Sequence, residues 1–213
     1  MQYHGTGASS SGRSPPLNLK EIWVIRIRLQ LALRTRELAL FNLAIDSKLR
    51  GCDLVGLLVH YVVQGSRVAP RASAMQKKTQ APVQFEVTEQ TRDAVAVWIT
   101  TADLKPQQFL FPSRVSESPH LSTWQNSRIV GFWVGSIGLD PAAYGAHTLP
   151  RTKATLIYRR SRNLRAVQLL LGHTKLECTV RYLGIEVDDA LEIASRRRLK
   201  LGRLVANAGP DGR

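Results

Sequence analysis

The sequence is short of several residue types, and each shortage narrows the class of protein. Only 2 of its 213 residues are cysteines, Cys52 and Cys178, and they do not form a Cys-x-x-Cys pair. This argues against a disulfide-rich secreted fold, and we expect two buried, reduced thiols in a cytoplasmic protein. The apolar runs are too short to cross a bilayer, and residues 1–16 lack the apolar core of a signal peptide, so no membrane partner is expected.

Acidic residues are also scarce. The chain has 16 Asp and Glu against 30 Lys and Arg, which gives a formal net charge of +14 at pH 7. A surplus of this size attracts polyanions, so nucleic acid is the expected partner. The five histidines do not pair with carboxylates at metal-ligand spacing, and there is no glycine-rich phosphate loop. We therefore expect neither a metal nor a nucleotide cofactor.

The hydrophobic pattern predicts an α+β domain that is mainly α-helical, with a small three-stranded antiparallel sheet. Apolar residues make up 44% of the chain, which is enough for a core. Apolar residues at helical spacing predict helices over 17–45, broken near 34–36, and over 46–55, 91–101 and 125–137. Short β-branched runs predict strands at 57–63, 67–76 and 83–87. The domain is expected to span 17–195, between a disordered lead, 1–16, and a basic tail, 196–213.

Capping residues predict two further helices before that tail. Asn163 can cap the first of them, and Gly172 ends it. A capping box at 174–177 then predicts the second helix over 175–183. Tyr182 lies near the end of this last helix.

Five short segments carry residues suited to breaking a phosphodiester without a metal. That chemistry needs a nucleophile, cations that offset charge growing on the phosphorus oxygens, and an acid for the leaving oxygen. Taken singly, each residue is more often a structural one, but their order and spacing together are specific. In chain order the segments are Arg50-Gly-Cys-Asp53, Gln76-Lys77-Lys78-Thr79, His147-Thr-Leu-Pro150-Arg151-Thr-Lys, Leu170-Leu-Gly172-His173 and Arg181-Tyr182.

In order and spacing these segments resemble the tyrosine recombinase (phage integrase) family. That family has an Arg, a Lys in a β-hairpin, an H-x-L-R box, an L-G-H box and a Tyr nine residues beyond the last His. The resemblance covers roughly residues 20–195 and implies the tyrosine recombinase catalytic-domain fold. It also implies site-specific DNA recombination or integration without a cofactor. The implied partners are double-stranded DNA and further copies of the chain, in a tetrameric synapse on that DNA.

The resemblance assigns the nucleophile and the acid. Tyr182 would attack the scissile phosphate, giving a 3′-phosphotyrosine and a free 5′-hydroxyl. Lys78 would protonate the departing 5′ oxygen, and Lys77 is the alternative if the hairpin register differs by one. Because the phosphotyrosine keeps the bond energy, rejoining would need no nucleotide.

The resemblance also assigns the residues that bind the phosphate. Arg50 would clamp the non-bridging oxygens with its planar guanidinium, which suits phosphate geometry. His147 would assist proton transfer or bind the phosphate, and His173 would donate a hydrogen bond to it. Asp53 is expected to orient the site or cap local backbone.

The chain departs from the family at Pro150, which stands where the second phosphate-binding Arg is expected. Proline suits a first helical turn, but losing one preorganised donor costs on the order of 10²–10³ in rate. Arg151 is rotated by about 100° on a helix and does not replace that geometry. An impaired DNA-binding relative that modulates an intact recombinase is therefore the alternative function, and a plain basic nucleic-acid binder is a third.

The second departure is length. Full recombinases carry an N-terminal helical domain that closes on the opposite face of the DNA, and too few residues precede Leu17 for such a domain. We therefore expect site recognition to be weaker, or to depend on another chain.

Overall fold

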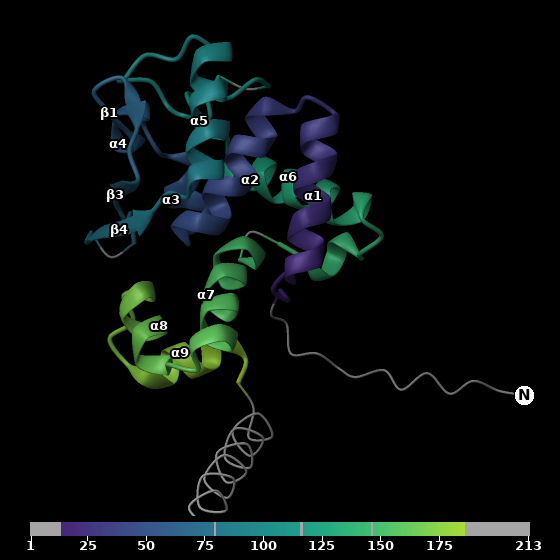
Figure 1. Cartoon of the computed structure of the whole chain (residues 1–213), viewed down its shortest axis with the longest axis vertical. Coiled ribbons are helices and arrows are strands. Elements are labelled where there is room, and N and C mark those ends of the chain that lie inside the picture. The colour runs from purple at the N-terminus through teal and green to yellow at the C-terminus, as the bar shows by residue number, and fades with distance from the viewer. Residues whose placement is uncertain (1–13, 79, 116, 146, 186–213) are drawn as a thin grey trace, which may run out of the picture. The chain divides into compact units, whose positions relative to one another are not determined.

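The computed structural model of the chain describes residues 14–78, 80–115, 117–145 and 147–185 (Figure 1). The chain divides into two compact units, the first ending at Arg162 and the second beginning at Asn163. The predicted basic tail lies outside the described residues, as does the predicted disordered lead up to residue 13. No helix in the described part is long and apolar enough to cross a membrane.

The mainly α-helical fold with small antiparallel sheets is confirmed. The second unit contains α8 (Leu164–Leu171) and α9 (Leu176–Leu183). The elements described in the first unit are, in chain order, α1 (Leu19–Leu31), α2 (Thr35–Ser47), α3 (Gly51–Val55), α4 (Val59–Val62), β1 (Val63–Gln64), β2 (Arg67–Val68), β3 (Arg71–Met75), β4 (Pro82–Glu86), α5 (Glu89–Thr101), α6 (Thr123–Ser136), the 3-10 helix η1 (Pro141–Ala143) and α7 (Thr148–Ser161).

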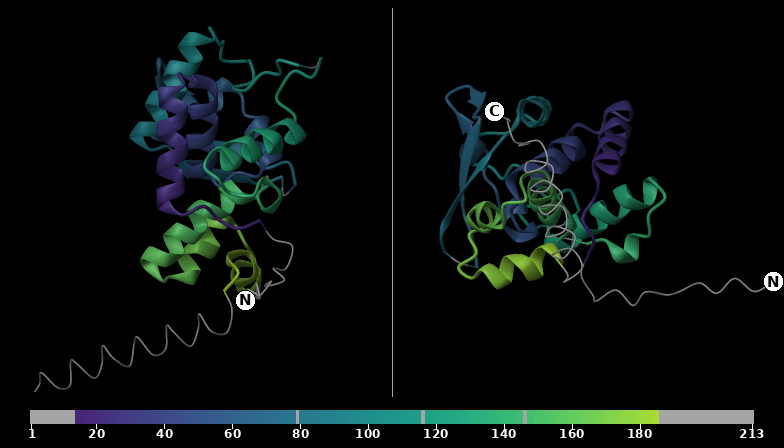
Figure 2. Two further views of the ribbon diagram at one scale, coloured as in Figure 1. Left: turned by 90° about the vertical axis from the view of Figure 1, so that its right-hand side faces the viewer. Right: turned by 60° about the horizontal axis from the view of Figure 1, so that its bottom comes forward.

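Helix α2 lies at the centre of the first unit. Its residues 39–47 are all buried, and it packs against α1, α5 and α7. Phe41 of α2 meets Trp133 of α6 edge to face, with 5.2 Å between the ring centroids. The strands lie at one side of this unit and α1 and α6 at the other (Figure 2). Large apolar side chains contribute about 1.5–3 kcal/mol each when fully buried, so the core around α2 stabilises the unit.

The described strands pair as two antiparallel hairpins, which corrects the prediction of one three-stranded sheet. β1 pairs with β2, and β3 pairs with β4 with Arg71 opposite Glu86. The strand predicted over 67–76 is broken before Arg71 because Pro70 has no amide hydrogen to donate to a neighbouring strand.

The strand predicted over 57–63 is also wrong. Leu58 makes an isolated antiparallel bridge with Phe109, and the chain then turns into α4. The amides of Val59 and His60 donate to the carbonyls of residues 108 and 106. These contacts with a distant loop outweigh the β propensity of the β-branched residues, which depends strongly on context.

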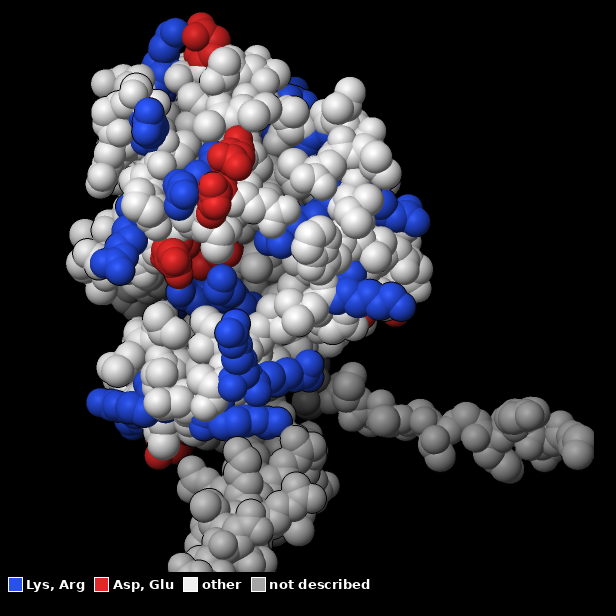
Figure 3. Space-filling model, viewed as in Figure 1, with Lys and Arg blue, Asp and Glu red and all other residues white. Residues whose placement is uncertain are grey.

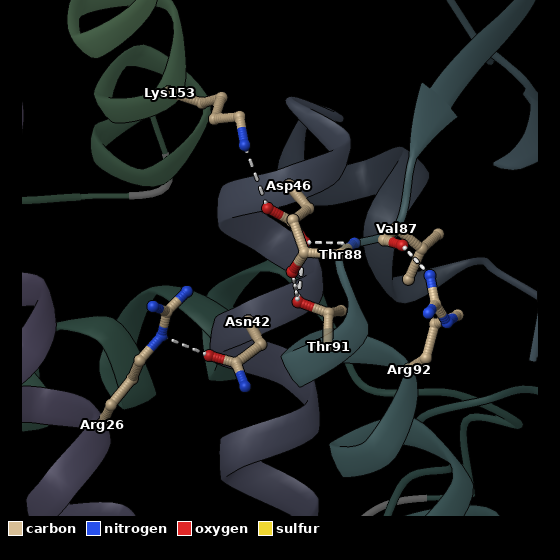
Figure 4. A network of polar contacts seen from close by, with 8 residues as sticks. All are labelled: Arg26, Asn42, Asp46, Val87, Thr88, Thr91, Arg92 and Lys153. Carbon is tan, nitrogen blue, oxygen red and sulfur yellow. Dashed lines mark hydrogen bonds and ion pairs between the residues drawn. The ribbon is translucent and has the colours of Figure 1, made fainter. Parts of the chain in front are cut away.

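A buried carboxylate, Asp46, joins three helices of the first unit (Figure 4). Its Oδ2 accepts hydrogen bonds from the Thr88 amide at 3.0 Å, the Thr88 hydroxyl at 2.6 Å and the Thr91 hydroxyl at 2.7 Å. Its Oδ1 accepts from Nζ of Lys153 on α7 at 3.1 Å. Only 2% of the Asp46 side chain is exposed. The contacts therefore hold the C-terminal turn of α2 against the start of α5 and against α7.

Burial raises the pKa of Asp46, but the hydrogen bonds from Thr88 and Thr91 and the charge of Lys153 outweigh it. The pKa of the carboxyl in the folded protein is therefore lower than its ordinary value. A group with a depressed pKa stabilises the fold above its ordinary pKa, and that contribution is lost as the pH falls. For an aspartate the loss begins below about pH 4.

We predict that Asp46→Asn lowers the free energy of unfolding at pH 7 by about 1–3 kcal/mol, the usual cost of an unsatisfied buried polar group. The difference between wild type and variant should shrink as the pH is lowered below about 4, because Asp46 then becomes protonated. Urea unfolding at pH 7 and pH 3 measures both effects.

Asp103→Asn is the matched control, because Asp103 pairs with Lys105 at 2.7 Å with its side chain 86% exposed. Its effect should be at most about 1 kcal/mol. An equal loss in both variants, or a difference for Asp46→Asn that does not change with pH, would contradict the assignment.

Candidate functional site

Arg50 stands at the N-cap of α3. The helix predicted over 46–55 is interrupted here, because α2 ends at Ser47 and Lys48 adopts a left-handed conformation with φ of 56° before α3 begins at Gly51. The Arg50 side chain is half-buried, and its Nη1 is buried with no hydrogen-bond partner among the described residues. A buried donor without an acceptor is costly. An anionic oxygen bound at this point would remove that cost.

Asp53 connects the Arg50 segment to the hairpin turn that carries the two candidate lysines. Its Oδ1 accepts a hydrogen bond from the amide of Lys77 at 2.9 Å, so it caps local backbone. Both Lys77 and Lys78 are exposed. The Lys77 side chain lies along the end of α3, where a Cβ added to Gly56 would be 3.6 Å from its Nζ. The turn therefore holds Lys77 next to the segment that carries Arg50, and Lys78 is the next residue of the same exposed turn.

His147 is the N-cap residue of α7, and its side chain is exposed. Pro150 lies in the first turn of this helix, as predicted, where the missing amide hydrogen costs little. Arg151 is buried, and its Nη1 donates to the Ser14 carbonyl at 2.7 Å. The guanidinium next to Pro150 is thus used to hold the chain segment that precedes α1.

His173 and Tyr182 lie together in the second unit. Their rings meet edge to face, with centroids 5.4 Å apart and an interplanar angle of 79°. Nδ1 of His173 is 3.1 Å from the buried hydroxyl of Thr179. Nε2 of Gln168 donates to the carbonyls of His173 and Thr174 at 2.9 and 3.2 Å. These contacts fix the orientation of the imidazole beside the tyrosine.

The predicted caps of α8 are confirmed, whereas the predicted start of α9 is corrected. Asn163 caps α8 by accepting from the amide of residue 166 at 2.9 Å, and Gly172 ends it with φ of 68°. This left-handed conformation favours glycine. The predicted capping box is wrong, because Lys175 is the N-cap of α9 and makes no side-chain cap. Gln168 donates a hydrogen bond to the carbonyl of Thr174, and this contact keeps Thr174 in the turn that precedes α9.

The two thiols differ from the prediction that both are buried. Cys178 is exposed and Cys52 is only partly buried. The buried positions of α9 are Thr179 and Leu183, four residues apart, so Cys178 lies off the buried face. Burial, followed by the neighbouring carboxylate of Asp53, raises the pKa of Cys52.

Within each unit the structure brings part of the predicted set together. In the first unit, Asp53 links the Arg50 segment to the hairpin turn that carries Lys77 and Lys78. In the second unit, the rings of His173 and Tyr182 are in contact. Sequence reasoning missed the pair of Asp46 and Lys153, which are 107 residues apart and form no local pattern. It also missed Gln168 and Thr179, whose supporting contacts with the His173 segment follow from the fold of α8 and α9.

The fold is shared with solved recombinase structures. XerH site-specific recombinase bound to difH substrate aligns with a TM-score of 0.68 and 18% identity, over 92% of this chain and 57% of that chain. The Tn1549 transposon integrase in complex with circular intermediate DNA aligns with a TM-score of 0.66 and 15% identity, over 89% and 68%. The fold is that of the tyrosine recombinase catalytic domain.

Sequence comparison identifies the family. The phage integrase family model matches residues 24–187, so this chain belongs to the phage integrase family. Probable integrase/recombinase YoeC of Bacillus subtilis is 28% identical over 153 residues, which is 72% of this chain and 80% of that protein. Tyrosine recombinase XerC of Neisseria gonorrhoeae is 28% identical over 156 residues, which is 73% of this chain and 49% of that protein. The chain thus aligns with about half the length of XerC.

We predict that Asp53→Ala releases the turn between β3 and β4, because it removes the acceptor of the Lys77 amide. Amide exchange over residues 76–81, followed by mass spectrometry, should accelerate by about 3–10-fold, as expected for one hydrogen bond. Asp53→Asn keeps an oxygen acceptor and should restore most of the protection. Unchanged exchange in Asp53→Ala would mean that the turn does not depend on this carboxylate.

Proposed function

We propose that the chain breaks and rejoins double-stranded DNA through Tyr182, as a site-specific recombinase or integrase. The observation that carries this proposal is the buried Nη1 of Arg50, which has no hydrogen-bond partner among the described residues. A planar guanidinium with an unsatisfied donor suits a phosphate oxygen better than any neutral ligand. The formal charge of +14 supports a polyanion as the partner.

In the proposed cleavage step, the Tyr182 oxygen attacks phosphorus and the bond from phosphorus to the 5′ oxygen breaks. His147 accepts the tyrosine proton, and Lys78 gives a proton to the departing 5′ oxygen. Arg50 and His173 hold the non-bridging oxygens while their charge increases. The products are a 3′-phosphotyrosine and a 5′-hydroxyl, so the reverse reaction with another 5′-hydroxyl rejoins a strand without added energy.

Lys77 is the alternative acid. Its amide is held by Asp53 and its side chain lies along Gly56. These contacts support a positioning role for Lys77 and leave Lys78 as our candidate for proton transfer.

A second function is favoured by Pro150. The family position for the second phosphate-binding cation holds a residue without charge, and the adjacent Arg151 binds the Ser14 carbonyl. A charged Arg on a transferring phosphoryl group is worth about 10³–10⁵ in rate. The alternative is therefore a DNA-binding relative with impaired catalysis that modulates an intact recombinase.

We further propose that the chain acts on DNA in the cytoplasm as a homo-oligomer, with a tetramer forming the synapse. One solved neighbour, lambda integrase, is a dimer bound to a core site. Lys and Arg side chains are numerous on the face of the molecule shown in Figure 3, which supports DNA as the partner.

The direct test uses a library of nicked duplexes with randomised sequence around the nick, which traps a covalent intermediate because the short cleaved product diffuses away. We expect a denaturant-resistant protein–DNA adduct that is lost in Tyr182→Phe, while non-covalent affinity stays within about 2-fold, since one hydroxyl hardly alters phosphate contacts. An adduct that persists in Tyr182→Phe would assign the attack to another residue, such as Tyr158.

The activity of the unaltered chain is expected to be low, and Pro150→Arg should raise the adduct yield per unit time by at least about 10²-fold. The added cation meets charge that grows in the transition state. Because Pro150 is buried in the first turn of α7, the melting temperature of the variant is compared with that of the wild type before adduct yields are compared. Pro150→Gln is the matched control, because it removes the proline without adding charge.

Two results would contradict this. Rapid cleavage by the unaltered chain would mean that another cation supplies the missing charge. If the Pro150→Arg variant folds and binds DNA but forms the adduct no faster, the cause of the low activity lies at another position.

A further inference from the structure

The N-terminal end of α2, the loop after α5 and one face of α6 form a concave site in the first unit. We call it the arginine groove. It has a volume of about 420 Å³, within the size range of sites that bind a side chain or small ligand. The residues that define it are Arg34, Arg36, Arg114, Arg128, Trp124 and Phe132.

The groove carries a surplus of positive charge. Four arginines line it, against one acidic residue, Glu37. Both oxygens of that carboxylate are engaged, one with Nη1 of Arg34 at 2.6 Å and the other with Nε1 of Trp133 at 2.8 Å. Glu37 pairs with Arg34 and its charge also acts on Arg36, so a single carboxylate is set against four guanidinium groups.

Arg36 has an unfavourable environment in the groove. Burial lowers its pKa and the nearby charge of Arg114 lowers it further, and together they outweigh the charge of Glu37, which raises it. Nη2 of Arg36 donates to the Pro112 carbonyl at 2.7 Å, but its buried Nε has no hydrogen-bond partner among the described residues. A carboxylate bound beside these two guanidinium groups would offset their repulsion and accept charge-assisted hydrogen bonds.

Two large aromatic side chains stand exposed at the groove. Trp124 is 66% exposed and Phe132 is 61% exposed. The guanidinium of Arg128 lies 4.8 Å from the Trp124 ring, and that of Arg34 lies 5.8 Å from the Phe132 ring. These contacts hold the aromatic walls in place. Aromatic side chains that are already ordered bind a partner at low conformational cost.

We propose that the arginine groove binds an acidic segment of a partner protein, with one large apolar side chain between Trp124 and Phe132. Carboxylates on either side of that anchor would pair with Arg114 and Arg128. The lining combines Trp, Phe and Arg and contains no Lys, which is the composition that distinguishes protein–protein interfaces. Duplex DNA offers phosphates but no large apolar side chain that could lie between Trp124 and Phe132, so the groove suits a polypeptide better.

The test measures fluorescence anisotropy of the full chain with a labelled peptide, Asp-Glu-Asp-Leu-Phe-Glu-Asp, at physiological salt. A second peptide with Ser-Ser in place of Leu-Phe has the same charge and reports general attraction to a basic protein. We expect at least about 10-fold tighter binding of the first peptide, as for a buried aromatic anchor. Equal affinity for both peptides would overturn the proposal.

Matched variants locate the binding site. Phe132→Ala, and the pair Arg114→Ala with Arg128→Ala, should each weaken peptide binding by about 10-fold. The control pair Arg159→Ala with Arg160→Ala removes two exposed charges from α7 and should change it by less than about 2-fold. All these side chains are exposed, so the variants should keep the wild-type melting temperature. An equal loss in the control pair would overturn the proposal.

Two further outcomes also count against it. The chain has its own acidic run, with Glu186, Asp188, Asp189 and Glu192. If peptide binding appears only after these four are changed to amides, the groove serves the chain itself. If the groove variants weaken duplex DNA binding more than the control pair does and leave the peptide unaffected, the groove is part of the DNA interface.

Discussion

The buried carboxylate of Asp46 is the constraint on which the arrangement of the first unit depends. It is four residues before Arg50, and its partner Lys153 is six residues after His147. The same carboxylate binds two hydroxyls and an amide at the start of α5. One buried charge thus links the helix that leads to Arg50 with the helix that begins just after His147. Because an unpaired buried carboxylate is costly, the three helices are held together in an arrangement that satisfies it.

Strong local signals made much of the fold predictable. The break predicted near 34–36 is found at residues 32–34, between α1 and α2, and Gly172 ends α8 as expected. The strand predictions failed where long-range contacts decide the outcome. Leu58 bridges to Phe109, about 50 residues away, and no period in the sequence shows that pairing. The capping box at 174–177 failed for a similar reason, since its Thr is held in the preceding turn by a side chain of α8.

The candidate residues could be named from the sequence, because they lie in short segments with fixed spacing. The residues that support them could not. Gln168 and Thr179 fix the His173 imidazole through contacts that exist only after α8 and α9 pack together. Asp53 was expected to orient the site or cap backbone, but its acceptor role toward the Lys77 amide depends on how the hairpin folds back onto α3. Spacing therefore identifies chemical groups, whereas packing determines their orientation.

Pro150 shows why fold and catalysis have to be argued separately in this family. The first turn of α7 needs residues that tolerate helical φ and a missing amide partner, and proline meets both needs as well as arginine does. Its neighbour Arg151 contributes to the fold through the Ser14 carbonyl. In our proposal the cation expected at this position would interact with a phosphate, so the helical backbone alone does not report whether it is there. The backbone of an active recombinase and that of an impaired one can therefore be the same. The difference between them lies in charge at the phosphate, a quantity that structural similarity does not measure.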